Sequence, residues 1–429
     1  MSYEIETASA QADQRRKLVE EKRLSCGSAV STPNSQQLAR FNVSLLTGGG
    51  DKPYVLGLTR ALTAERLLVE IVGSDALSVP ELLDNPDVKF LNLRGDQSAD
   101  ARPVTKITRI TKYYIKLLLF AASTKAEIFH LLWNNKFEFF DRTVLMVYYR
   151  LLGKWVVLTA HNINAGQRDA NDSWANRFSL TIQYRLSNHI FVHTEKMKKE
   201  LVVGFELAEE KVSVIPFGIN KTTRETCLSS REAKQRIGID ADDKTLLFFG
   251  QIAPYKGLEY LVAAFKDLAR SDDTYRLIIA GKPKWSGAYW KEVKKAIIDS
   301  GSGERIVERI EYIPDEETEI YFKAADVLIL PYTEIFQSGV LFLGYNFGLP
   351  AVVTDVGSLK EEIVEGRTGF VCRPKDSCDL AVTIRRYFAS AMFGELDLHR
   401  SRIKEFANER YSWSKVAAIT KAVYLGLAR

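Results

Sequence analysis

The chain has 429 residues, more than one ordinary domain holds, so two domains are expected. Its composition, 46% hydrophobic and 26% charged, is typical of a soluble globular protein, and no apolar run approaches the ~18 residues of a membrane span. The net charge of +5 is spread along the chain, which argues against nucleic acid as a partner and suits an anionic ligand or membrane surface. The four cysteines form no CxxC pair and no apolar leader follows Met1, so the sequence predicts a cytoplasmic protein with reduced thiols.

The first regular pattern begins after a polar segment. Residues 1–38 lack a sustained apolar period and are predicted to be a mobile tail. A buried strand at 41–46 then leads into a glycine-rich turn at 47–50, a helix at 54–68 and a strand at 68–72. This order of strand, turn, helix and strand is typical of a parallel α/β unit.

The same alternation continues to about residue 215. Strands are predicted at 88–93, 128–132, 155–159, 189–192 and 212–215, and helices at 105–122, 139–152 and 176–186. Residues 39–220 are therefore predicted to form an N-terminal Rossmann-like domain.

The cycle starts again after a polar connection at 219–243. Strands are predicted at 245–249, 276–280, 309–312, 327–330, 351–354 and 369–372, with helices at 259–270 and 289–300. We expect residues 221–400 to form a second Rossmann-like domain and the helical residues 401–429 to pack back toward the first. The fold class predicted is α/β, with two doubly wound domains facing across a cleft.

Gly49 and Gly50 belong to the first of three segments that could carry chemistry. A glycine run between a strand and a helix lets the backbone approach a phosphate or a sugar closely. The run lacks the GxGxxG spacing of a dinucleotide site, and an ordinary tight turn is the alternative interpretation.

The second segment follows the strand at 245–249. It contains Gly250, Gln251 and Lys256, and the lysine lies in the loop at the carboxyl end of that strand. An ammonium group there can neutralise a diphosphate leaving group. A solvated surface lysine is the alternative.

The third segment follows the strand at 327–330. Glu334 and Gln337 precede Ser338 and Gly339, which are predicted to open a helix that continues through Val340. Backbone N–H groups at such a helix start can hold phosphate oxygens, and Glu334 and Gln337 could bond sugar hydroxyls. A serine N-cap is the simpler interpretation, and both can hold together.

Taken in order, these segments resemble retaining glycosyltransferases of family 4, which have the GT-B fold. The resemblance also includes the strings that begin at Tyr312-Ile313, Ala324, Gly348 and Gly366, the Thr-Ala-His string ending at His161, and Tyr411-Ser-Trp413. It implies that residues 39–220 form the acceptor-side domain and that the C-terminal domain holds a UDP- or GDP-sugar. It also implies that His161 lies near the reactive carbon and that Lys256 contacts the donor phosphates. It implies no metal and no further cofactor. The remaining donor-binding residues implied are Gly49, Gly50, Gln251, Tyr312, Ile313, Glu334, Gln337, Ser338, Gly339 and Val340.

Two positions depart from the family pattern. Gln251 stands where a basic residue is common. The second glutamate of E-x(7)-E is also missing, since counting forward from Glu334 reaches Phe342, and counting back from Gly348 reaches Ile335 and Leu343. A catalytically silent GT-B protein that binds nucleotide-sugar or a partner is therefore the main alternative. An epimerase of similar fold would need paired carboxylates, and no such pair is recognisable.

The predicted function is transfer of a hexose-type sugar to an acceptor hydroxyl in surface polysaccharide or glycoconjugate assembly. The acceptor expected is a glycan or a lipid-linked glycan. Residues 102–125 contain six basic and no acidic side chains, interspersed with apolar ones, which favours contact with the anionic inner face of a membrane. An ordinary amphipathic helix covering a sheet is the alternative.

Overall fold

The computed structural model of the protein describes residues 42–98, 102–164, 166, 172–219, 226–284 and 287–428. The tail predicted at 1–38 lies outside these ranges. The described residues contain two sheets, which we call sheet A and sheet B, and all strand pairs in both are parallel. The predicted pair of Rossmann-like, doubly wound sheets is confirmed.

Sheet A has seven strands in the order β3-β2-β1-β4-β5-β6-β7. Their bounds are β1 (Asn42–Leu46), β2 (Leu68–Gly73), β3 (Val88–Asn92), β4 (Ile128–Leu131), β5 (Trp155–Thr159), β6 (His189–Val192) and β7 (Val212–Val214). Chain order reverses between β1 and β4, which pair with Val43 opposite Ile128. A ligand of such a sheet binds beyond the strand ends at this reversal.

The helices of sheet A are α2 (Lys52–Ala64), α3 (Pro80–Leu83), α4 (Pro103–Ser123), α5 (Glu138–Phe140), α6 (Met146–Leu151), α8 (Trp174–Leu186) and α9 (Glu195–Phe205), together with a π-helical turn η2 (Asp141–Leu145) and short 3-10 turns at Asp75–Leu77 and Glu209–Lys211. The single helix predicted at 139–152 is thus divided by η2. Within η2, Thr143 Oγ1 donates to the carbonyl of Phe139 at 2.6 Å, a side-chain bond that competes with regular helical pairing.

Sheet B has six strands in the order β10-β9-β8-β11-β12-β13. Their bounds are β8 (Lys244–Phe249), β9 (Tyr275–Ala280), β10 (Ile306–Arg309), β11 (Val327–Leu330), β12 (Ala351–Thr354) and β13 (Gly369–Cys372). The reversal falls between β8 and β11. Their side chains are almost all buried, because helices cover both faces of a parallel sheet.

One predicted strand of sheet B was displaced along the sequence. The strand was expected at 309–312, but β10 begins at Ile306 and ends at Arg309. Ile306 pairs with Leu277 of β9. Ile306 is buried whereas Tyr312 is 70% exposed, so burial of Ile306 fixes the register of this edge strand.

The helices of sheet B are α10 (Ser230–Arg236), α11 (Leu258–Ser271), α12 (Ala288–Ser300), α13 (Asp315–Ala324), α14 (Gly339–Asn346), α15 (Ser377–Phe388), α16 (Ala391–Gly394) and α17 (Leu396–Arg410), with short 3-10 turns at Pro254–Lys256, Gly303–Arg305 and Lys360–Glu362. In α11 the apolar side chains recur every three or four residues, and Leu261, Phe265 and Leu268 are fully buried.

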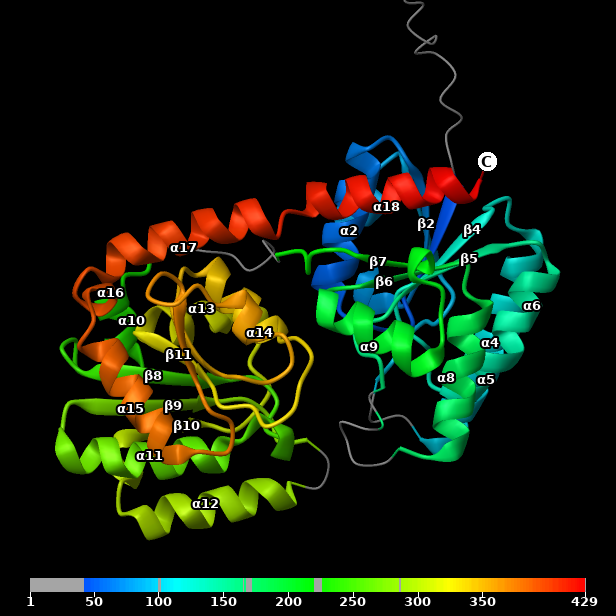
Figure 1. Cartoon of the computed structure of the whole chain (residues 1–429). Coiled ribbons are helices and arrows are strands. Elements are labelled where there is room, and N and C mark those ends of the chain that lie inside the picture. The colour runs from blue at the N-terminus through cyan, green and yellow to red at the C-terminus, as the bar shows by residue number, and fades with distance from the viewer. Residues whose placement is uncertain are drawn as a thin grey trace, which may run out of the picture. The chain divides into compact units, whose positions relative to one another are not determined.

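The last two helices are shared between the two cores. Ile403 and Ala407 of α17 pack into a core of sheet B, whereas Val416, Ala417 and Tyr424 of α18 (Trp413–Leu427) pack into a core of sheet A. Helix α18 lies along α2, as Figure 1 shows. Within the described ranges, none of the helices combines the length and the hydrophobicity needed to cross a bilayer.

Candidate functional site

The glycine turn after β1 packs against the loop after β4. Gly48 and Gly49 have φ of +57° and +81°, which side chains rarely adopt. A Cβ on Gly50 would lie 2.0 Å from the Trp133 ring, and one on Gly48 would lie 2.2 Å from the Trp133 carbonyl oxygen. Close packing against Trp133 therefore accounts for two of these three glycines. Asp51 ends the turn by capping α2, since its Oδ1 accepts from the Tyr54 amide at 3.1 Å.

His161 follows β5 and belongs to an aromatic cluster at this end of sheet A. Its ring stacks on Trp133 at 4.2 Å between centroids and 8° between planes. Tyr54 meets His161 edge-on at 4.7 Å, and Trp413 from α18 meets Tyr54 at 5.0 Å. These contacts hold the imidazole in one orientation.

The hydrogen bonds of His193 determine which nitrogen of His161 carries its proton. His193 Nδ1 lies 3.3 Å from the Ile215 carbonyl, which only accepts, so Nδ1 is the donor. Burial lowers the pKa of His193 to about 4, so its other nitrogen is an unprotonated acceptor at neutral pH. His161 Nδ1, 3.0 Å from that nitrogen, therefore donates to it.

This assignment leaves Nε2 of His161 as an acceptor. The atom is buried and has no hydrogen-bond partner among the described residues. Burial, and then the neighbouring His193, lower the pKa of His161 well below its ordinary value, so the ring is neutral. A buried acceptor without a partner is costly, and a hydroxyl group of a ligand would satisfy it.

Lys256 and Val340 converge on Gly250 at the reversal in sheet B. Gly250 follows β8 with φ of +97°, and a Cβ there would lie 3.2 Å from Lys256 Nζ and 3.3 Å from Val340 Cγ2. Lys256 is only 6% exposed, and its ammonium lies 5.2 Å from the centroid of the Tyr332 ring. The lysine is thus held at the strand end and is not a solvated surface side chain.

Ser338 occupies the N-cap position of α14, although its side chain does not cap the helix. Its Oγ lies 3.3 Å from the hydroxyl of Tyr332. The first N–H groups of any helix lack intrahelical acceptors, so those of Gly339 and Val340 are oriented to bind an anion. The simple serine cap considered from the sequence is wrong, because Ser338 Oγ makes no cap hydrogen bond and instead pairs with Tyr332.

Gln337 contacts a carboxylate that the sequence did not single out. Its Nε2 donates to Glu362 Oε1 at 3.3 Å, while its Oε1 is buried and without a partner among the described residues. Glu362 also accepts from the Tyr411 hydroxyl and lies 3.7 Å from Arg410. Burial raises the pKa of Glu362, although these partners oppose the shift.

Phe342, which stands where the family's second glutamate is expected, is a core residue. It is 2% exposed, stacks on Phe217 at 5.0 Å, and meets Tyr411 at 4.9 Å. A carboxylate at this depth would be costly, so packing excludes glutamate there.

The predicted site residues divide between the two sheets. Gly49, Gly50 and His161 lie at sheet A, and the rest lie at sheet B. Ile313 is buried in the core and Tyr312 is exposed, whereas Gln251, Glu334 and Gly339 are exposed on loops or at a helix start. Sequence reasoning missed Trp133, Tyr332 and Glu362. The position of Trp133 directly after the strand predicted at 128–132 could have indicated it, because ligands of such sheets bind beyond the strand ends.

No metal-binding group is evident in the described part of the chain. There, no three His, Cys, Asp or Glu side chains are placed so that they could hold an ion. The groups that could act on a ligand at these strand ends are the buried Lys256, the N–H groups at the start of α14 and the neutral His161.

Comparison with known proteins agrees with this architecture. Residues 229–410 match the family described as Glycosyl transferases group 1. An uncharacterized glycosyltransferase of Methanocaldococcus jannaschii is 28% identical over 243 residues, which are 56% of this chain and 60% of that protein. The matches to such relatives span between about half and two thirds of the relatives' own length.

Solved structures of GT-B glycosyltransferases share the fold of the whole described chain. Sucrose-phosphate synthase from Thermosynechococcus elongatus has a TM-score of 0.72 at 17% identity, covering 90% of this chain and 99% of that one. The Anabaena protein HepE, solved with UDP and glucose, has a TM-score of 0.69 at 17% identity, covering 90% and 100%. The GT-B fold expected from the sequence is confirmed.

Proposed function

We propose that this protein is a retaining glycosyltransferase that moves a hexose-type sugar from a UDP- or GDP-sugar to an acceptor hydroxyl. The observation that carries the proposal is the convergence of Gly250, Lys256 and Val340 at the strand reversal of a glycosyltransferase group 1 domain. The structure of HepE with UDP and glucose supports a nucleotide-sugar as the donor.

In this proposal the donor diphosphate lies between Lys256 and the start of α14. Lys256 Nζ and the N–H groups of Ser338, Gly339 and Val340 stabilise the charge that grows on the diphosphate as it departs. Each strong donor of this kind is worth ~3–4 kcal/mol in a transition state. The buried position of Lys256 strengthens the interaction, because little water screens it.

His161 would position the donor sugar. Its Nε2 is an acceptor, so it suits a sugar hydroxyl and does not suit a phosphate oxygen. The stack on Trp133 fixes the direction of that lone pair.

The proposed step exchanges one bond at the anomeric carbon for another on the same face. The bond from that carbon to the diphosphate oxygen breaks, and a bond to the acceptor oxygen forms. The acceptor proton passes to the leaving diphosphate oxygen, so no protein nucleophile is required. No metal ion and no further cofactor are part of this proposal.

A catalytically silent nucleotide-sugar-binding protein is the second candidate. The packing of Phe342 supports it, because no carboxylate replaces the missing glutamate at that position. Calorimetric titration with UDP-, GDP- and ADP-sugars, followed by assays of donor hydrolysis and transfer, separates the two. Tight binding of one donor without hydrolysis or transfer to any glycan would favour the silent protein.

We further propose that the acceptor is a glycan or a lipid-linked glycan, in polysaccharide or glycoconjugate assembly.

We also propose that α4 contacts an anionic membrane at its inner, cytoplasmic face. Helix α4 directs Tyr113, Tyr114 and Leu117 into the core, so part of the apolar surface of residues 102–125 is internal. Its outer face exposes other apolar side chains, including Ile115 at 54% and Leu119 at 65%. Lys112 and Lys116 are exposed beside them.

Vesicle sedimentation tests the membrane contact. Binding to anionic vesicles should weaken with salt and be lost in an Ile115→Asp/Leu119→Asp variant. Val203→Asp, at a position on α9 that is 79% exposed, is the matched control and should bind as the wild type does. Equal binding of all three proteins would exclude α4 as the contact.

A further inference from the structure

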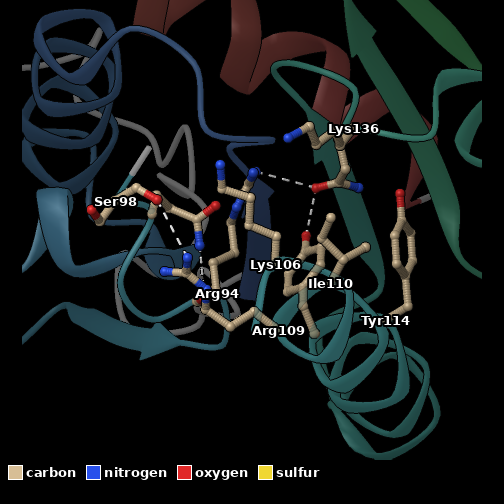
Figure 2. A pocket seen from close by; sticks show the side chains of 10 residues that line it. Arg94, Ser98, Lys106, Arg109, Ile110, Tyr114 and Lys136 are labelled. Carbon is tan, nitrogen blue, oxygen red and sulfur yellow. Dashed lines mark hydrogen bonds between the residues drawn. The ribbon is translucent and has the colours of Figure 1, made fainter. Parts of the chain in front are cut away.

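A basic cavity beside the glycine turn is not used by the donor chemistry above. It has a volume of about 260 Å³ and lies between the segment after β3, the first half of α4 and the loop after β4. Figure 2 shows the side chains that line it. We call it the α4 pocket. The side chains that carry its charge are Arg94, Lys106, Arg109 and Lys136.

The positive charge of the α4 pocket is only partly compensated. None of the described residues that line it is acidic. Arg109 pairs with Asp96 at 3.0 Å, outside the lining. The side chains of Lys106 and Lys136 make no hydrogen bond or ion pair with any described residue, and they come from two different segments, α4 and the loop after β4. At least two ammonium groups are thus available to an anion.

Two further acidic groups, Asp141 and Glu138, lie on the segment after Lys136 and are already engaged. Asp141 is buried and accepts from Tyr114 at 2.9 Å and from Asn135 Nδ2 at 3.2 Å. Glu138 pairs with Arg142, away from the lining. Asp141 orients Asn135 so that its Oδ1 accepts from Tyr113 at 2.6 Å and from Arg94 at 3.4 Å. This network fixes the Arg94 guanidinium, which also lies 5.2 Å from the Tyr113 ring centroid.

Arg94 connects the α4 pocket to the glycine turn. A Cβ on Gly49 would lie 2.8 Å from Arg94 Nη1, so the guanidinium lies directly against the turn. The adjacent Gly50 contacts Trp133, and Trp133 stacks on His161. A series of contacts through the glycine turn and the Trp133 ring therefore connects Arg94 of the α4 pocket to His161.

We propose that the α4 pocket binds a phosphoryl group carried by the acceptor. The inference rests on the proposed function, which assigns the donor diphosphate to Lys256 and α14 in sheet B. The α4 pocket is a second candidate anion site, formed by segments around sheet A, and it suits the acceptor substrate. Arginine and lysine together match the several oxygens and the charge of a phosphoryl group. The volume suits a phosphoryl group with part of its neighbour, since whole-ligand pockets are larger, at about 300–1,000 Å³.

Binding can be measured without donor or transfer. The full chain is titrated with glucose 6-phosphate, with glucose as the uncharged control, and is sedimented with phosphatidylcholine vesicles that contain or lack phosphatidic acid. A Lys106→Ala/Lys136→Ala variant should bind the phosphorylated probe at least about tenfold more weakly, because charged hydrogen bonds are lost. Lys291→Ala/Lys295→Ala removes the same charge from the exposed face of α12, away from α4, and should retain the affinity of the wild type.

The titration with glucose 6-phosphate and the sedimentation with phosphatidic acid vesicles distinguish a soluble phosphorylated acceptor from a lipid-linked one. Loss of glucose 6-phosphate binding in the Lys106/Lys136 variant supports a soluble phosphate ester, whereas loss confined to phosphatidic acid vesicles supports a lipid-linked one. Equal losses of binding in the Lys106/Lys136 and Lys291/Lys295 variants, or no loss with either probe, would overturn the inference. Binding that depends on Lys106 and Lys136 in a protein without transferase activity would overturn only the proposed function.

Discussion

Lys256 illustrates how the surroundings of a residue decide its role. The loop that carries it is short, and Gly257 at φ +63° lies so close to Pro331 that a Cβ would be 2.1 Å from its carbonyl oxygen. Thr333 fixes the same loop, since its amide donates to the Tyr255 carbonyl at 2.8 Å. Backbone contacts between the β8 and β11 loops therefore hold the ammonium in place.

Lys256→Ala should lower transfer by about 100-fold or more while the protein stays folded, because charge stabilisation of the leaving diphosphate is lost. Lys295→Ala, on the exposed face of α12, is the matched control. Steady-state kinetics with the donor identified by titration gives the measurement. Wild-type kinetics in the Lys256 variant would remove this lysine from the site.

His161→Ala should lower turnover more than it lowers donor affinity, since one positioning hydrogen bond is lost while the phosphate contacts remain. His161→Asn keeps a short polar side chain and is expected to restore part of the turnover. Donor affinity from titration and turnover from initial rates are compared for both variants. A fall in donor affinity as large as the fall in turnover would contradict a role in positioning.

At the scale of elements, an indole side chain is one of the contacts that hold α18 to sheet A. Trp413 Nε1 donates to the Ile219 carbonyl at 2.8 Å, and its ring fills the space opposite Gly57 of α2 and Gly218. A Cβ on Gly57 would lie 2.2 Å from this ring. Packing of the indole thus requires a glycine in the interior of a helix.

Gly57→Ala should destabilise the protein, although alanine at an unhindered helix position is favoured over glycine by roughly 0.5–1 kcal/mol. In a Trp413→Ala background the same change should become neutral or stabilising, because the clash has gone. Trp413→Ala by itself is expected to cost about 3 kcal/mol through the cavity it leaves.

A double-mutant cycle of urea unfolding free energies measures this coupling. The cycle needs the wild type, both single variants and the double variant under one set of conditions. Additive effects would show that Trp413 and Gly57 do not contact each other.

At the scale of the whole molecule, buried histidines connect distant segments. His130 of β4 is fully buried between Tyr424 of α18, at 2.6 Å, and Thr159 of β5, at 2.7 Å. Burial lowers the pKa of His130 to about 3 and those of His189 and His193 to about 4. Between these pKa values and about pH 6.5, the three rings stay neutral in the folded protein, whereas the same histidines are protonated in the unfolded chain.

Stability should therefore fall as the pH drops below about 6.5, by up to about 1.4 kcal/mol per pH unit for each such histidine. The unfolded state binds more protons than the folded state between pH 6.5 and the folded pKa, so acid favours unfolding. Buried Glu362, whose pKa is raised, acts in the opposite sense. The unfolding free energy of His130→Gln should fall less steeply with decreasing pH than that of the wild type.

Urea unfolding of both proteins at pH 8, 6 and 5 gives this comparison. At pH 8 the histidines are neutral in both states, so the difference there reports packing alone. Parallel pH profiles for the wild type and His130→Gln would contradict the assigned burial effect.

The sequence by itself determined the alternation of strands and helices and the two-sheet GT-B architecture. Hydrophobic periodicity and turn chemistry are local properties, and they located β5, β6, β11 and β12 at their observed bounds. They did not predict the bounds of the edge strand β10, whose register depends on burial of Ile306. They also did not predict η2, where Thr143 bonds to a backbone carbonyl. The loops of Lys256 and Ser338 were predictable because each directly follows a strand.

Only the tertiary structure decided which of those loops meet and what they contact. The stack of Trp133 on His161, the bond from Gln337 to Glu362 and the burial of Phe342 join segments far apart along the chain. The α4 pocket likewise forms from three segments, and the pairing of β1 with both β2 and β4 brings them together. Strand order is a property of the folded sheet, and the periodicity of a single segment carries no record of its neighbours.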